Sequence, residues 1–366
     1  MNVGLGVAVL ISCLGWAAPA RSWNAAGHET VGAIADHLIA GTPAAAQVNA
    51  ILGMELRTAS VWADCVKGVS LQDGEFRYTV SARYRECRPF EDAAGQARMV
   101  DYVARNSDAC HRGIAGHSGT ADDAASAVPC HKQYHYTDVA IERDQYVRSE
   151  VGTSDHDIVA AITAAVRVLQ DRPAPAPFSI KDKREALLML VHFVGDLHQP
   201  LHVGAIYLDP AGHEVDPDRG TFDPDTETRG GNQLLEGHRV LHTEWDDIAR
   251  DLGPDHLVMS GDADARALPK TAGPPAEWSM AWAGDTLRVS HAVFDGVIFG
   301  AENLDQHTWP MTLPPGYAER REALQRRQLV VAGARLAEIV ERLFPPPGHR
   351  KATGTPRAEE GAAHGR

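Results

Sequence analysis

Apolar residues recur along much of the chain at the three- and four-residue spacing that places them on one face of a helix. The clearest run is 155–170, where Ile158, Ile162, Val166 and Leu169 lie one turn apart. The same periodicity predicts helices over residues 27–40, 44–52, 181–197, 234–252, 277–299 and 317–343. No run of alternating residues predicts a strand. The pattern therefore indicates an all-α fold, a single-domain bundle of seven or eight helices.

Two long segments interrupt the helices. Residues 68–130 are polar and Gly-rich and hold three cysteines, and residues 207–229 are acidic and rich in Gly and Pro. We interpret the first as a partly irregular excursion tied down by disulfides and the second as a loop. Residues 345–366 have no periodicity, which predicts a disordered tail.

The first 22 residues have the pattern of an export signal. An apolar run from Val3 to Leu14 is too short for a membrane anchor, and Ala20 and Ser22 are small residues where signal peptidase reads the chain. No Lys or Arg precedes the run, so a buried N-terminal helix is the alternative. We expect residues 1–22 to be removed, residues 23–344 to form the catalytic domain, and the protein to be secreted or periplasmic.

Composition narrows the class of protein. The 366 residues are 44% hydrophobic, enough for one large domain, and no segment after residue 22 is long and apolar enough to cross a membrane. The net charge of -14 excludes a coat protein that binds nucleic acid through a basic surface. If the substrate is a nucleic acid, bound metal cations must supply positive charge at the site.

Four cysteines remain after removal of the signal, which contains Cys13. An even number in an exported chain predicts two disulfides, with three possible connectivities. None of the spacings is C-x-x-C, which argues against a cysteine zinc site. The four are Cys65, Cys87, Cys110 and Cys130.

Two predicted helices carry a histidine four residues before an aspartate. The pairs are His192 with Asp196 and His242 with Asp246, and His202 follows the first pair after a turn. The spacing puts both side chains of a pair on one helix face, and histidine with carboxylate suits zinc in an open catalytic site. The alternative for each pair is a structural hydrogen bond between imidazole and carboxylate.

Three upstream residues are weaker candidates by themselves. They are His28, Asp64 and His135. A new N-terminus at Trp23 strengthens the case for His28. An α-amino group has a pKa of about 7.7–8.0 and ligates metal when deprotonated.

The order of these motifs resembles one known family, the zinc-dependent single-strand-specific nucleases of the S1/P1 type, which are distant relatives of zinc-dependent phospholipase C. The resemblance covers the chain from Trp23 to the helix that ends near Leu343. It depends on the combination Trp23…Gly27-His28, Trp62-Ala-Asp64, His135-Tyr-Thr-Asp138, His192-Phe-Val-Gly-Asp196-Leu-His-Gln-Pro-Leu-His202, Gly230-Gly-Asn232 and His242-Thr-Glu-Trp-Asp246.

The resemblance implies a fold of the zinc phospholipase C and nuclease type with three zinc ions. It also implies cleavage of single-stranded DNA or RNA to 5′-phosphate products, 3′-nucleotidase activity, and a monomer. The implied ligand sets are Asp64, His135, His192 and Asp196 for one ion, His202, His242 and Asp246 for the second, and Trp23 (amino and carbonyl groups) with His28 for the third, bridged by Asp196.

The substrate-binding and catalytic residues follow from the same resemblance. Tyr136 would stack on a nucleobase, Asp138 would hydrogen-bond it, and Asn232 would line the same pocket. Asp64 would orient the nucleophile. Lys67 stands where the family has a phosphate-binding arginine, and a lysine cannot make the bidentate contact of an arginine.

The sequence leaves two other functions open. A zinc-dependent phospholipase C would use the same metals on a lipid phosphodiester, but Tyr136 with Asp138 suits a base and has no evident use for a choline headgroup. A non-enzymatic, secreted zinc-binding protein is the second alternative. The open ligand sets and the absence of a His-rich tract argue against it.

Overall fold

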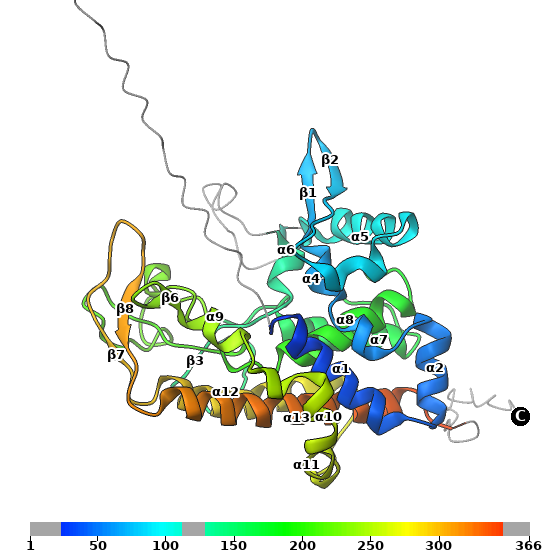
Figure 1. Ribbon diagram of the computed structural model, residues 1–366. Coiled ribbons are helices and arrows are strands. Elements are labelled where there is room, and N and C mark those ends of the chain that lie inside the picture. Colours follow the sequence, from blue (N-terminus) through cyan, green and yellow to red (C-terminus); the bar gives the residue numbers. More distant parts are fainter. Residues whose placement is uncertain (1–22, 112–128, 347–366) are drawn as a thin grey trace, which may run out of the picture.

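The computed structural model describes residues 23–111 and 129–346 and is dominated by helices (Figure 1), which confirms the predicted all-α class. The predicted signal, residues 1–22, and most of the predicted tail lie outside the described residues. Within the described part of the chain, no helix is long and apolar enough to span a membrane.

Helix α8 (Lys183–Asp196) is the centre of the core. Each of its residues from Glu185 to Asp196 is buried, and Asp182 caps its start by accepting the backbone N–H of Glu185 at 2.8 Å. A helix that is buried all round needs neighbours on every side. Helices α1 (Ala25–Ile39), α7 (Ile158–Leu169) and α13 (Tyr317–Leu343) pack against it.

The other helices surround this core. The disulfides are Cys65–Cys87 and Cys110–Cys130, one of the three connectivities that the sequence allows. They cross-link residues 68–130 internally and to the helix that contains Cys65. The remaining helices are α2 (Pro43–Leu52), α3 (Leu56–Ala59), α4 (Trp62–Val66), α5 (Ala93–Asn106), α6 (Cys130–Gln133), α9 (Leu241–Asp246), α10 (Pro254–Ser260), α11 (Asp262–Ala267) and α12 (Trp278–Phe294).

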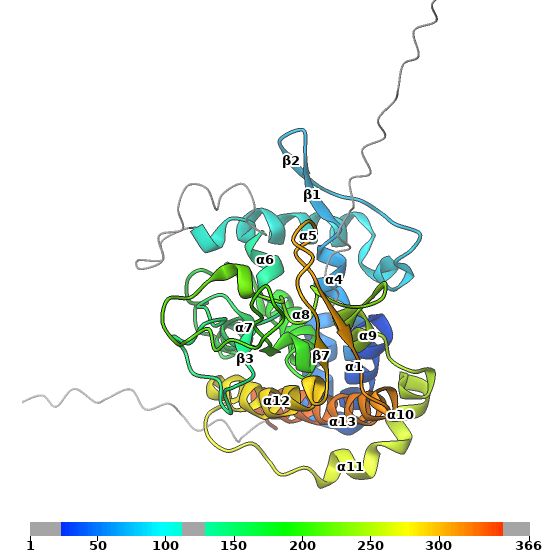
Figure 2. The same ribbon diagram turned by 90° about the vertical axis from the view of Figure 1, so that its left-hand side faces the viewer.

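In the described part of the chain, short strands form three small sheets, which the sequence pattern did not predict. The hairpin of β1 (Val69–Gln72) and β2 (Glu75–Tyr78) projects from the helical body on the side away from α12 and α13 (Figures 1 and 2). Strands β3 (Val139–Ala140) and β4 (Gly204–Ala205) pair in parallel. The third sheet has the order β6-β5-β8-β7 and consists of β5 (Leu234–Glu236), β6 (Arg239–Val240), β7 (Ile298–Phe299) and β8 (Trp309–Thr312).

The predicted helix over residues 234–252 is wrong in its first part. Residues 234–240 form β5 and β6, joined by a turn at Gly237 with φ of 64°, and only Leu241–Asp246 is α-helical. Leu234 pairs with Trp309, 75 positions along the chain, so its environment comes from a long-range contact that local periodicity does not contain.

Candidate metal centre

Five imidazoles and three carboxylates converge between the N-terminal helix, α8 and α9. They come from α1, α4, the segment before β3, α8, the turn after it, and α9. All of them are buried except Asp64, whose side chain is 27% exposed. The residues are His28, Asp64, His135, His192, Asp196, His202, His242 and Asp246.

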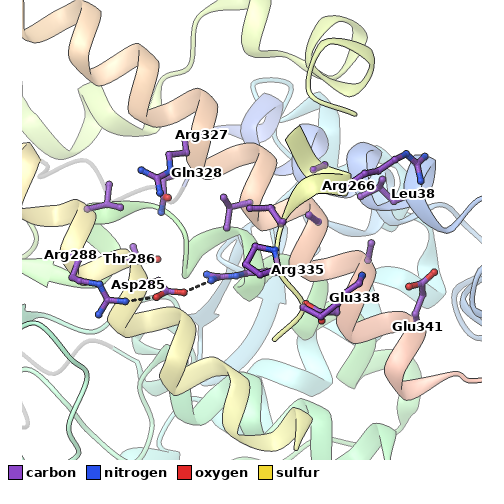
Figure 3. Close-up of a pocket in the computed structure, with 18 residues that line it drawn as sticks. Leu38, Arg266, Asp285, Thr286, Arg288, Arg327, Gln328, Arg335, Glu338 and Glu341 are labelled. Carbon is purple, nitrogen blue, oxygen red and sulfur yellow. Dashed lines mark hydrogen bonds and ion pairs between the residues drawn. The ribbon is translucent and has the colours of Figure 1, made fainter. Parts of the chain in front are cut away.

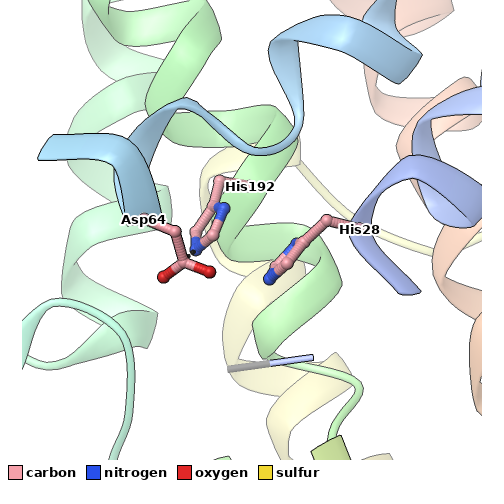
Figure 4. A group of neighbouring side chains, drawn as sticks. All are labelled: His28, Asp64 and His192. Atoms are coloured by element: carbon pink, nitrogen blue, oxygen red, sulfur yellow. Dashed lines mark ion pairs between the residues drawn. The ribbon is translucent and has the colours of Figure 1, made fainter. Parts of the chain in front are cut away.

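The first group brings three helices together. His28 from α1, Asp64 from α4 and His192 from α8 point toward one another (Figure 4), and each offers a ligand atom within 4.8 Å of the others. The rings of His28 and His192 are stacked, with centroids 3.9 Å apart. Nδ1 of His192 donates to the carbonyl oxygen of Ser60 at 2.6 Å, so Nε2 is the ring nitrogen that faces the group.

The carboxylate of Asp196 is shared. Its Oδ2 is 2.9 Å from Nδ1 of His135 and 3.0 Å from Nε2 of His192, while its Oδ1 is 3.2 Å from Nε2 of His28. Burial by itself would raise the pKa of Asp196, but the imidazoles of His192, His202 and His28 hold it well below its usual range. Asp196 is therefore ionised, and its two oxygens face different imidazoles.

The second i, i+4 pair joins His202 to form another group. Nδ1 of His202 lies 2.8 Å from the carbonyl oxygen of His135, and Nδ1 of His242 lies 2.7 Å from that of Gly230. Both rings thus donate from Nδ1, and their Nε2 atoms face each other 3.2 Å apart. Asp246 adds its Oδ2, 3.5 Å from Nε2 of His242.

The chemistry of these donors fits divalent cations. Nδ1 of His28 and Oδ2 of Asp246 are buried and have no hydrogen-bond partner among the described residues, an arrangement that is costly without a cation. Burial, together with the carboxylates of Asp196 and Asp64, raises the pKa of Asp246 well above its usual range. A bound cation favours the ionised form of all three carboxylates.

Trp23 lies against both ligand helices. Its buried indole donates from Nε1 to the carbonyl oxygen of Gly195 at 3.0 Å, and the backbone N–H of Asn24 donates to the carbonyl oxygen of Asp246 at 2.9 Å. A Cβ at Gly27 would come within 2.9 Å of Trp23 Cβ, so the helix accepts only glycine there without a shift. These contacts hold the backbone of Trp23 beside residues 195 and 246.

Two groups of sequence-predicted residues border the ligands. Nζ of Lys67 donates to Oδ1 of Asp64 at 2.6 Å. The half-buried Tyr136 directly follows His135, and it lies near Asp138. Burial raises the pKa of Asp138 to about 7; the Glu227 carboxylate adds to the effect and Arg229 opposes it.

The turn that contains Asn232 lies beside Asp138. A Cβ added to Gly230, whose φ is 56°, would come within 3.3 Å of Oδ1 of Asp138. The side chain of Asn232 donates to the carbonyl oxygen of Arg229 at 2.8 Å. The three residues predicted to bind a base thus belong to neighbouring segments.

Sequence reasoning missed Gln199. Its buried side chain donates from Nε2 to Oδ1 of Asp246 at 2.7 Å and accepts the backbone N–H of Leu201 at 2.6 Å, so it orients a carboxylate and fixes the turn that carries His202. Its position between two candidate ligand segments was the available signal. His198, by contrast, points away from the ligands: its Nδ1 donates to the carbonyl oxygen of Val194 at 2.7 Å.

A helical domain with three adjoining His/Asp groups has the donor side chains that polynuclear metal hydrolases use. The sequence matches the family model described as S1/P1 Nuclease over residues 93–345, and the chain belongs to this family of nucleases, hydrolases of phosphodiester bonds in nucleic acids. The match contains His135 and every later ligand candidate, whereas Trp23, His28, Asp64 and Lys67 precede it. No curated protein matches the sequence.

Proposed function

We propose that this nuclease is a zinc-dependent enzyme that cleaves single-stranded DNA or RNA to 5′-phosphate products and removes the phosphate from 3′-nucleotides. The observation that carries the proposal is the carboxylate of Asp196, which lies within 3.2 Å of His28, His135 and His192 and so links the groups into one centre. Three neighbouring divalent ions suit a phosphodiester, whose reaction places charge on several oxygens at once.

The residues divide into three ligand sets, as the family resemblance implies. Zinc bound by them would act as a Lewis acid toward the phosphate and make a water molecule acidic enough to attack phosphorus near neutral pH. The hydrogen bonds from Nδ1 of His192, His202 and His242 to backbone carbonyls fix the tautomers that ligation requires. The sets are Asp64, His135, His192 and Asp196; His202, His242 and Asp246; and Trp23 with His28, bridged by Asp196.

Lys67 and Asp64 are the proposed catalytic pair. The lysine ammonium, 2.6 Å from the carboxylate, is the one cationic side chain bonded to a candidate ligand among the described residues. Lys67 would hold a phosphate oxygen and stabilise the charge that develops on it. Asp64, the most exposed of the three carboxylates, would accept a hydrogen bond from the attacking water and orient it.

Tyr136, Asp138 and Asn232 would bind the base. Stacking on one aromatic ring accepts any base but requires that the base be unpaired, which favours single strands. Asp138 and Asn232 offer hydrogen-bonding groups for the base edge beside that ring. A lipid headgroup would not use this combination, and the nuclease is therefore favoured over a phospholipase C.

The proposal also includes export of the protein and removal of its signal. Residues 1–22 would be removed as a signal, which leaves the amino group of Trp23 free to ligate the third ion, and residues 23–344 would form the catalytic domain of a monomer, followed by the tail. The two disulfides support an oxidising compartment, outside the cell or in the periplasm.

The direct test is a substrate panel for the purified enzyme. Single-stranded DNA, duplex DNA, RNA, 3′-AMP and phosphatidylcholine would be compared at equal phosphodiester or phosphomonoester concentration. We expect cleavage of the single-stranded polymers and release of phosphate from 3′-AMP, with little action on the duplex. Preferential cleavage of phosphatidylcholine would identify a phospholipase C instead, and activity on none of the five would refute the proposal.

A further inference from the structure

A cavity of about 690 Å³ lies between α12 and α13 (Figure 3), and residues 268–270, which follow α11, line it as well. None of the candidate metal ligands lines it. Its volume is within the range of small-molecule sites, roughly 300–1,000 Å³. Leu38, Val289 and Val331 supply apolar wall, whereas much of the remaining lining is charged or polar.

The floor of this cavity carries more positive than negative charge. The guanidinium groups of Arg288 and Arg335 both bond to the single carboxylate of Asp285 (Figure 3). Arg335 also donates to Nε2 of His198 at 3.0 Å and lies over the ring of Trp282, 5.5 Å from its centroid. Two guanidinium groups that share one carboxylate leave an unbalanced cation at the floor.

The rim adds two further cations. Lys270 and Arg327 line the cavity, and neither forms an ion pair within the part of the chain that the structure describes. Glu338, one turn along α13 from Arg335, already accepts the backbone N–H and the hydroxyl of Thr271 at 2.8 and 2.9 Å. Glu341 lies on the last lining turn of α13, beyond Glu338.

A buried hydroxyl on the same lining has no partner. Thr286 is 1% exposed, and its Oγ1 makes no hydrogen bond with any described residue. A helical threonine ordinarily bonds to the carbonyl four residues before it, so an unpaired buried hydroxyl is unusual and costs free energy. Thr286 lines the same cavity as Asp285, the carboxylate that both guanidinium groups bond, so a ligand on these groups lies within the same lining.

We propose that this cavity is a second anion site, which binds a phosphate-bearing small molecule through Arg335, Arg288 and the hydroxyl of Thr286. Arginine and hydroxyl groups are the usual donors to phosphate oxygens, and Lys270 and Arg327 balance the ligand's remaining charge. The apolar wall has room for an organic group attached to the phosphate. The protein's net charge of -14 makes a positive cavity on its surface a local exception.

The test is calorimetric titration of the zinc-loaded enzyme with inorganic phosphate and, in a second arm, with a nucleoside 5′-monophosphate. The variants are Thr286→Val, which keeps the side-chain shape, and the double variant Lys270→Ala/Arg327→Ala, which changes only rim residues. The control is Arg326→Ala, because Arg326 neighbours Arg327 on α13 but pairs with Asp264 at 2.9 Å outside the cavity.

We expect a phosphate site that both variants weaken by about tenfold or more and that the control leaves unchanged. At the site that the variants weaken, tighter binding of the nucleotide than of phosphate would identify an organic phosphate as the occupant, and equal binding would identify phosphate itself. A binding isotherm that is identical in all four proteins would overturn the proposal. If the unmodified enzyme cleaves none of the proposed substrates but still binds phosphate in this cavity, only the proposed function is refuted. The two outcomes are separable because no residue of the proposed metal centre lines the cavity.

Discussion

The Nε2 atoms of His202 and His242 face each other at 3.2 Å, although each ring already donates from Nδ1 to a backbone carbonyl. Two unprotonated nitrogens at this distance would repel, and a cation between them removes the repulsion. The tautomers of the two rings and the distance between them therefore favour a metal ion at this position. This argument is independent of the residue types.

Asp196 should matter more to metal binding than any other ligand. Asp196→Asn keeps the size of the side chain but removes the charge that two ions would share, so we expect loss of more than one zinc ion per chain and of nearly all activity. The control is His213→Ala, which removes an exposed histidine that lies outside the three groups. Three zinc ions retained by the Asp196 variant in elemental analysis would contradict the assignment.

The sequence predicts the helices that have their own apolar face. Helix α13 spans Tyr317–Leu343, the predicted bounds, and α8 differs from its prediction by a residue or two at each end. Helix α5 lies in residues 68–130, which the sequence pattern predicted to be irregular. Its buried residues are only Met99, Tyr102, Val103 and Asn106. Because most of the other residues are polar or small, the helical spacing of apolar residues is too weak to detect in the sequence.

The candidate site was more predictable than the fold around it. The candidate ligands were named because the order of their motifs resembles that of the nuclease family, and the structure brings the eight side chains from His28 to Asp246 into three adjoining groups. The neighbours of each ligand were not predictable, because contacts such as Gln199 with Asp246 and His192 with the Ser60 carbonyl join segments 47 and 132 positions apart. Disulfide pairing was open for the same reason.

Tyr136 should contribute to binding only when the substrate has a base. We expect Tyr136→Ala to weaken binding by about 1–3 kcal/mol per stacked base. Tyr136→Phe keeps the ring and should bind nearly as well as the unmodified enzyme. The measurement is KM for a dinucleotide beside that for a phosphodiester without a base. An equal loss on both substrates would show that Tyr136 supports the metal centre rather than the base.

Asp138 should make base recognition depend on pH near neutrality. Burial raises its pKa to about 7, so the carboxyl is neutral below that pH and ionised above it. An ionised carboxylate accepts the N–H groups of guanine, and we expect kcat/KM for a guanine substrate, relative to a baseless one, to rise as pH passes through about 7. The ratio cancels titrations of the metal centre. Asp138→Asn should flatten it, and an unchanged profile in that variant would count against the role.

The same raised pKa affects stability. The folded protein binds a proton at Asp138 more tightly than the unfolded chain does, so this group favours folding most below its unfolded pKa of about 3.9. Its contribution is lost as pH rises toward 7. Thermal unfolding of Asp138→Asn should accordingly lack this part of the pH dependence.

The N-terminus should be part of the metal centre. An additional residue before Trp23 would convert the free amine into an amide nitrogen, which is a poor metal donor. We expect protein that begins Met-Trp23 to fold but to lack one zinc ion and most activity, while export through a cleaved signal restores both. If Trp23 serves only to pack its indole, the two forms will have equal zinc content and equal rates.

The most direct test of the account is the zinc content of the exported enzyme, measured by elemental analysis while its cleavage of single-stranded DNA is followed. The account predicts three zinc ions per chain, loss of cleavage as a chelator removes them, and recovery when zinc is returned. Full cleavage by protein from which all zinc has been removed would contradict it.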